Sequence, residues 1–285
     1  THVAGTVAGN TQGWARDANV YNMSFESTAG GNNGITGLWW YNIMFEYVRY
    51  FHNNKPINAA TGRRNPTIVN NSYGFYNNDG EILLSTINEI KYRGVTTNFS
   101  GMTTAQKRTA LQSRRIPVPT SSWGGNYNSD RTPYMGNRVA SIDADIEDCI
   151  NDGVIMVGSA GNQYWPIDRS GGNDYDNILV INGAGYYCSR GSTPGNTETS
   201  AGNVISVGAI DYFTNDRKGY FSNCEERVDV WAPGVNIMSS VANSSSGYGN
   251  QQPDPRDSNY YNARAQGTSM ASPQVAGLLA CAAEQ

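Results

Sequence analysis

The chain has 285 residues, of which 15% are charged, and its net charge at pH 7 is −4. A chain of this length can form a single α/β domain with one large core. The acidic balance provides no basic surface that would attract nucleic acid or an anionic membrane. The longest apolar runs, at residues 153–157 and 275–283, are much shorter than the roughly 18 residues that predict a membrane span. We therefore expect no nucleic-acid partner and no membrane span.

Short β-forming runs alternate with helical patterns along the chain. This alternation is typical of βαβ units, in which helices cover both faces of a parallel sheet. Apolar runs predict strands at residues 19–25, 67–71, 154–158, 204–208 and 228–232. Periodic apolar positions predict helices at residues 37–51, 139–151 and 269–283. The expected fold is a three-layer α/β/α domain with a central, mainly parallel sheet.

Two long stretches interrupt this alternation with Gly, Pro and Asn clusters. They run from about residue 75 to 138 and from 163 to 203. Stretches of this length without regular structure are uncommon as simple connections inside a domain. We interpret both as surface insertions, the first of which carries a helix at residues 104–115.

The four cysteines show no pattern of a metal site. They form no CxxC pair and have no histidine at zinc-ligand spacing. Cys149 and Cys281 fall in apolar helical patterns, where a thiol serves as a small buried hydrophobic group. Cys188 and Cys224 fall in polar loops, and their spacing leaves open whether they form a disulfide.

The segment GTSMASPQVAG, residues 267–277, has the features of a nucleophilic serine. Such a serine needs exposure at a tight turn, backbone N–H groups directed at the developing oxyanion, and a rigid element behind it. A Gly-Thr-Ser turn that leads directly into a helix provides all three. Taken alone, Ser269 could equally be an ordinary helix N-cap.

The residues around Ser269 favour the nucleophile, because they resemble the subtilisin-family motif GTSMAxPxVAG. Four further segments resemble motifs of that family, and they follow one another in the family's order. They are THVAGTVAG (1–9), IVNNSYG (68–74), GVIMVGSAGN (153–162) and YFSNCEERVDVWAPG (220–234). Over most of its length the chain is thus similar to a subtilisin-like serine peptidase domain. Its loop lengths are closest to those of the proteinase K branch.

The resemblance implies roles for two residues in catalysis. Ser269 would be the nucleophile that forms an acyl-enzyme. Its own backbone N–H and the side-chain amide of Asn162 would bind the oxyanion. Without the motif around it, Asn162 could be a turn residue, since asparagine after glycine tolerates the left-handed conformation.

The resemblance also implies how a polypeptide substrate would bind. An extended peptide would pair as an additional strand between two edges of the cleft. One edge would be Ser72, Tyr73 and Gly74, and the other Gly34, Ile35 and Thr36, although a plain loop is the alternative for the second. The pocket for the residue before the cleaved bond would be lined by Ser159, Ala160 and Gly161.

The first motif departs from the family pattern in a way that concerns the catalytic base. The family motif reads His-Gly-Thr-His-Val-Ala-Gly-Thr, and its first histidine is the base, so His2 matches the second, structural histidine. His52 closes an aromatic helix and is expected to be a solvated C-terminal cap. The candidate aspartates follow the histidine motif, whereas the family places the orienting aspartate before it. We therefore expect the domain to be truncated at its N-terminus, with the catalytic His and Asp upstream of residue 1.

The sequence indicates no certain cofactor. Many subtilisins insert a calcium-binding loop after the Val-Ala-Gly-Thr helix, but the connection between Gly9 and Gly13 has no room for one. Asp168, Asp174 and Asp176 bring hard oxygen ligands together and could hold a structural calcium ion. A polar loop without metal is the alternative.

Two functions therefore compete. The first is a serine endopeptidase, and the second is a catalytically inactive subtilisin-like module with a structural or binding role in a larger assembly. Intact Ser269 and Asn162 favour the enzyme, since a scaffold has little need of both. The abundance of Asn, Gly, Tyr and Ser suits an extracellular or virion-associated protein in either case. The sequence does not predict an oligomeric state.

Overall fold

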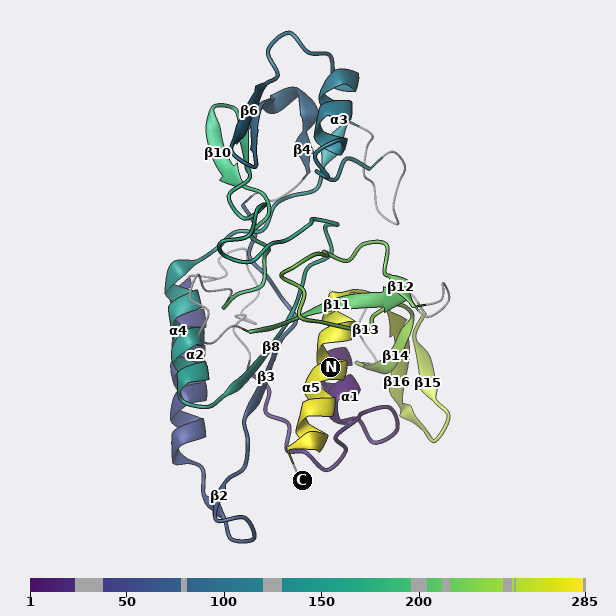
Figure 1. Ribbon diagram of the computed structural model, residues 1–285. Coiled ribbons are helices and arrows are strands. Elements are labelled where there is room, and N and C mark those ends of the chain that lie inside the picture. Colours follow the sequence, from purple (N-terminus) through teal and green to yellow (C-terminus); the bar gives the residue numbers. More distant parts are fainter. Residues whose placement is uncertain are drawn as a thin grey trace.

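A mainly parallel sheet lies at the centre of the computed structural model (Figure 1). Four parallel strands lie side by side in the order β3 (Ile68–Asn71), β8 (Ile155–Ser159), β11 (Ile205–Asp211) and β13 (Val230–Pro233). The short β12 (Arg217–Lys218) pairs antiparallel with the end of β11. The structure describes residues 1–23, 38–77, 81–119, 130–195, 204–211, 216–242, 248 and 250–283.

Helices cover both faces of this sheet (Figure 1). On one side lie α2 (Leu38–Asn54) and α4 (Ala140–Asn151), and on the other lie α5 (Thr268–Ala282) and α1 (His2–Ala8). Successive side chains of a strand point to opposite faces. Accordingly, in β8, Met156 packs in the cluster that contains residues of α2 and α4, and Val157 packs in the cluster that contains residues of α5. The expected three-layer α/β/α arrangement is confirmed.

The two stretches interpreted as insertions meet in a separate lobe, seen at the top of Figure 1. An antiparallel sheet in the order β10-β9-β5-β6 forms the lobe together with α3 and the one-turn helix η1. Their bounds are η1 (Leu84–Thr86), β5 (Ile87–Tyr92), β6 (Val95–Asn98), α3 (Thr104–Gln112), β9 (Ile178–Ile181) and β10 (Ala184–Tyr187). Strands from the two stretches pair directly, β5 with β9, and the hydrophobic cluster that fills the lobe extends to Ala160 and Val228 of the main domain.

A third, antiparallel sheet lies beside α1 and completes the domain. Its order is β14-β16-β15, with bounds β14 (Ile237–Val241), β15 (Gln252–Asp254) and β16 (Asp257–Ala265). Two short pairs lie elsewhere, β1 (Ile57–Asn58) with β2 (Arg63–Arg64) and β4 (Ile82–Leu83) with β7 (Arg131–Thr132). Among the described residues, no helix is both long and apolar enough to cross a membrane.

Three local expectations were wrong. Residues 19–23 form no strand: they pair with no described strand and leave Val20 and Tyr21 53% and 66% exposed, while residues 24 and 25 lie outside the described part. The helix α3 ends at Gln112, since Arg115 has a left-handed φ of 62°. His52 is half-buried rather than solvated, and its Nδ1 lies 2.9 Å from Thr67 Oγ1.

All four cysteines are free thiols. Cys149 is fully buried as expected, and burial raises its pKa to about 12. Cys281 is only half-buried. Cys188 is buried, Cys224 is half-buried, and no disulfide joins them.

Candidate functional site

Ser269 lies in the first turn of α5, directly after a backbone turn at Gly267. The φ of Gly267 is 147°, a backbone conformation that residues other than glycine rarely adopt. Because α5 begins at Thr268, the amide of Ser269 has no partner within the helix. The side chain is half-buried, and its Oγ donates a hydrogen bond of 3.2 Å to the carbonyl of Ser72.

Asn162 follows the end of β8 and is fixed by the residue next to Ser269. Its Oδ1 accepts hydrogen bonds from Thr268 N at 2.8 Å and from Thr268 Oγ1 at 2.9 Å. The chain can turn here because Gly161 has a φ of 102°, and a Cβ at Gly161 would lie only 2.5 Å from Asn223 Nδ2. With Oδ1 fixed, the amide nitrogen is the free end, and no described residue accepts a hydrogen bond from it.

Two hydrogen-bond donors lie close to Gly267. A Cβ at that position would lie 3.5 Å from Asn162 Nδ2 and 3.6 Å from both Ser269 N and Met270 Sδ. Both nitrogens thus lie near Gly267, and one of them is the backbone nitrogen of Ser269 itself. Two such donors at one point can stabilise a negative oxygen.

The residues proposed for the first substrate edge follow β3 without a break. Ser72, Tyr73 and Gly74 are half-buried. The backbone N–H and C=O of Gly74 form no hydrogen bond with the described residues. Gly34, Ile35 and Thr36, proposed for the second edge, lie outside the described residues.

Ser159, Ala160 and Gly161 are buried at the end of β8. Residues of the second long stretch lie against them, with Thr193 Oγ1 donating to Ser159 O at 2.7 Å. Ser192 lies between the substrate edge at Gly74 and the pocket residue Gly161. Its Oγ would be 2.8 Å from a Cβ at Gly74 and 2.9 Å from a Cβ at Gly161.

His2 lies away from the Ser269 hydroxyl. It is 2% exposed, and its Nε2 lies 3.1 Å from the carbonyl of Ile237 and 3.3 Å from that of Ala263, in the β14–β16 sheet. Burial lowers the pKa of its imidazole, although the two carbonyls act against this. Within the described part of the chain, no histidine or carboxylate forms a hydrogen bond with Ser269.

Burial of neutral His2 predicts a loss of stability at mildly acidic pH. Its pKa in the folded state is below the usual 6.5, so the unfolded state binds more protons as the pH falls through that value, and the free energy of unfolding decreases. We expect the melting temperature to fall more between pH 7.5 and pH 5.5 in the parent than in His2→Gln. Equal decreases in the two proteins would contradict this.

The three aspartates considered for calcium do not form a common site. Asp174 pairs with Arg93 at 2.8 Å, and Asp176 pairs with Arg190 at 2.7 Å. One oxygen of Asp168 accepts from the backbone N–H of Asp174. Within the described ranges, no three His, Cys, Asp or Glu side chains are grouped so that they could hold a metal ion.

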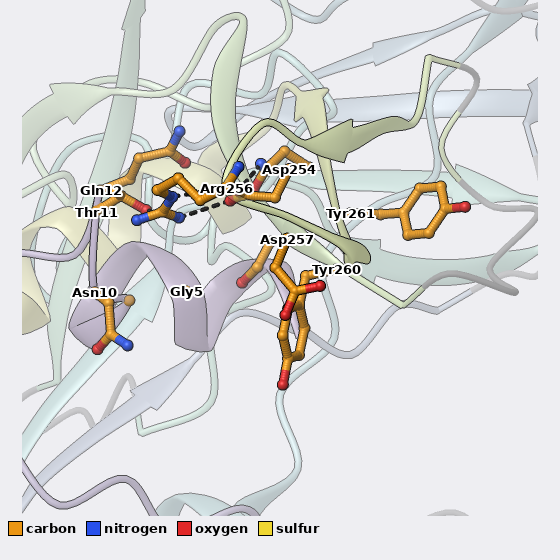
Figure 2. A pocket seen from close by; sticks show the side chains of 12 residues that line it. Gly5, Asn10, Thr11, Gln12, Asp254, Arg256, Asp257, Tyr260 and Tyr261 are labelled. Atoms are coloured by element: carbon orange, nitrogen blue, oxygen red, sulfur yellow. Dashed lines mark hydrogen bonds and ion pairs between the residues drawn. The ribbon is translucent and has the colours of Figure 1, made fainter.

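A cavity of about 340 Å³ lies away from Ser269, between the end of α1 and the β15–β16 hairpin (Figure 2). Asp254 and Arg256 form an ion pair at its edge, and Arg256 also reaches Thr11. Neither Ser269 nor Asn162 lines it.

Three residues of the site were not foreseen from the sequence. Thr268 fixes Asn162, and Asn70 and Ser272 connect β3 to α5, since Ser272 Oγ donates to Asn70 Oδ1. All three lie inside the segments that resemble family motifs, and this resemblance was the feature of the sequence that could have identified them. Their partners, however, are set by packing between segments about 100 and 200 residues apart in the chain.

Comparison with known proteins places these motifs in one family. The model of the Subtilase family matches residues 1–285. A thermophilic serine proteinase from Bacillus sp. (strain AK1) is 35% identical over 147 residues, which are 48% of this chain and 32% of that protein. A cuticle-degrading serine protease from Arthrobotrys oligospora is 30% identical over 155 residues, 54% of this chain and 28% of that protein. The matched part thus spans about a third or less of these relatives.

One solved structure shares the overall fold. It is described as proteases from Pseudoalteromonas arctica and superposes with a TM-score of 0.50 at 20% identity, over 98% of this chain and 56% of that chain. At this level of identity, the likeness concerns the fold alone.

Proposed function

The chain belongs to the subtilase family, and on that basis we propose that it is the main part of a serine endopeptidase domain that forms an acyl-enzyme on Ser269. The observation that carries the proposal is the position of two nitrogens with no hydrogen-bond acceptor among the described residues, Asn162 Nδ2 and Ser269 N, near the same point at Gly267. A module that only binds or supports other proteins has no need for two such donors close to a serine.

In the proposed reaction, Ser269 Oγ attacks the carbonyl carbon of the peptide while a general base removes its proton. The carbonyl oxygen becomes an oxyanion and accepts hydrogen bonds from Ser269 N–H and Asn162 Nδ2. The C–N bond then breaks, the base returns the proton to the leaving amine, and water hydrolyses the acyl-enzyme by the same route. We assign the base and its orienting carboxylate to a histidine and an aspartate outside residues 1–285, following the register of the first motif.

The substrate is proposed to be an extended polypeptide. The unpaired backbone groups of Gly74 can form β-type hydrogen bonds with such a peptide. The residue before the cleaved bond would enter between Gly74 and Gly161, where Ser192 limits the depth. We also propose the proteinase K branch, on the short connection between Gly9 and Gly13, and an extracellular or virion-associated location.

A peptidase assay tests this proposal. We expect the natural full-length protein to cleave an unfolded protein substrate and recombinant residues 1–285 to be slower by at least about 10³-fold, because a serine without its base is a poor nucleophile. Thermal unfolding of the fragment must show that it is folded. No activity in the full-length protein would favour the inactive module, and full activity in the fragment would mean that it contains a base.

A further inference from the structure

Asn70 connects the end of β3 to the helix that carries Ser269. Its Oδ1 accepts from Ser272 Oγ, and its Nδ2 donates to Ser72 Oγ at 2.8 Å. Ser272 is fully buried and lies one turn after Ser269 in α5, on the same face. The amide therefore holds a residue of the helix with one end and a residue of the proposed substrate edge with the other.

The Ser72 hydroxyl links Asn70 to Ser269 by a second hydrogen bond. Having accepted from Asn70, it donates to the carbonyl of Ser269 at 3.0 Å. That carbonyl lacks its usual helical donor, because residue 273 is a proline and has no N–H. Ser72 thus satisfies a carbonyl that Pro273 leaves free, while the carbonyl of Ser72 accepts from Ser269 Oγ at 3.2 Å.

The direction of each hydrogen bond depends on the amide of Asn70. Because Nδ2 can only donate, the Ser72 oxygen accepts from it, and the Ser72 proton is free to reach Ser269. A carboxylate at position 70 would instead accept the Ser72 proton and remove the bond to the Ser269 carbonyl. The geometry of Ser269 relative to β3 is therefore set by a side chain that does not touch it.

We propose that Asn70 is a positioning residue for the nucleophile and acts through the hydroxyl of Ser72. This proposal rests on the proposed role of Ser269. It assigns to Asn70 no contact with substrate, so its loss should affect kcat and leave KM nearly unchanged.

The test is a double-mutant cycle in the full-length protein. We expect Asn70→Asp, which is close to isosteric, to lower kcat by about 10- to 100-fold, the size expected for a small misplacement of a reacting group, with KM within about twofold. In the Ser72→Ala background the same change should lower kcat by less than about twofold, because the hydroxyl through which it acts is gone. Independent effects, or a kcat for Asn70→Asp within twofold of the parent, would overturn the proposal.

Asn177→Ala is the matched control. Asn177 is another asparagine whose amide makes two hydrogen bonds, accepting from Arg93 N and donating to Asp174; it is buried, whereas Asn70 is half-buried, and it lies in the upper lobe. We expect it to lower the melting temperature while kcat of the folded protein stays unchanged. A loss of kcat in Asn177→Ala as large as that in Asn70→Asp would show a general effect of destabilisation and overturn the proposal.

A second readout does not depend on activity. In crystal structures of parent and Asn70→Asp, we expect the bond between Ser72 Oγ and the Ser269 carbonyl to be present in the first and lost in the second. If the full-length parent has no peptidase activity, the proposed function fails, and these structures still decide whether Asn70 positions Ser269. An unchanged bond in the variant would overturn the inference.

Discussion

Ser269→Ala in the full-length protein should lower kcat for peptide hydrolysis by about 10⁶-fold. The substitution removes the oxygen that forms the acyl-enzyme, and the oxyanion donors alone supply only a residual rate. The expected size is the one measured for removal of the nucleophile in subtilisin itself. Steady-state hydrolysis of a chromogenic peptide amide measures it.

Ser113→Ala is a suitable control, since Ser113 is an exposed serine at the end of α3 in the upper lobe. This variant should retain the parent rate. If Ser269→Ala kept more than about 1% of the parent kcat, the nucleophile would have to be another residue.

Asn162→Ala should lower kcat by about 10²- to 10³-fold and change KM little, because an oxyanion donor acts mainly in the transition state. This range, too, is known from the matching donor of subtilisin. Asn162 Oδ1 is held by Thr268, so the variant also loses two hydrogen bonds in the folded state. Thermal unfolding must therefore be measured beside the kinetics.

The kinetic pattern decides the role of Asn162. A change in kcat smaller than about threefold would move the oxyanion role to another donor. An effect confined to KM would make Asn162 a residue that binds the ground state. Asn177→Ala again controls for the loss of a hydrogen-bonded amide far from the site.

The two inner strands of the central sheet, β8 and β11, could be predicted because most of their residues are buried. Such strands appear in the sequence as continuous apolar runs, and residues 154–158 differ by only one position from β8 as observed. The run at residues 19–25 is less apolar, with asparagines at positions 19 and 22 and a serine at position 24, and its described part pairs with no strand. The composition of a segment indicates whether it could form a strand, but the strand forms only where a second strand is available to pair with it.

The upper lobe could not be predicted because its pairing joins distant segments. Ile87 in β5 pairs with Ile181 in β9, and the intervening chain includes α4 and β8 of the main sheet. In β5 buried and exposed residues alternate imperfectly, so neither period nor composition indicates the partner. The Gly, Pro and Asn clusters set the two stretches apart in the sequence, but nothing in the sequence indicated that their strands would form one sheet.

The sequence motifs identified the candidate residues Ser269 and Asn162, but not the hydrogen bonds that hold them. Ser269 and Asn162 stand out because their neighbours match a family pattern. Thr268 and Asn70 matter through hydrogen bonds that exist only once β3, β8 and α5 pack together. The burial of His52 escapes prediction for the same reason, since Thr67, its partner, precedes the strand beneath α2.

The central claim, that Ser269 is an activated nucleophile, is tested most directly by covalent labelling. The full-length protein should react with a fluorophosphonate probe, and peptide mass spectrometry should locate the adduct on Ser269, because only an activated serine attacks the phosphorus. The heat-unfolded protein should remain unlabelled. An adduct on another residue, or no adduct on a folded full-length protein, would contradict the account.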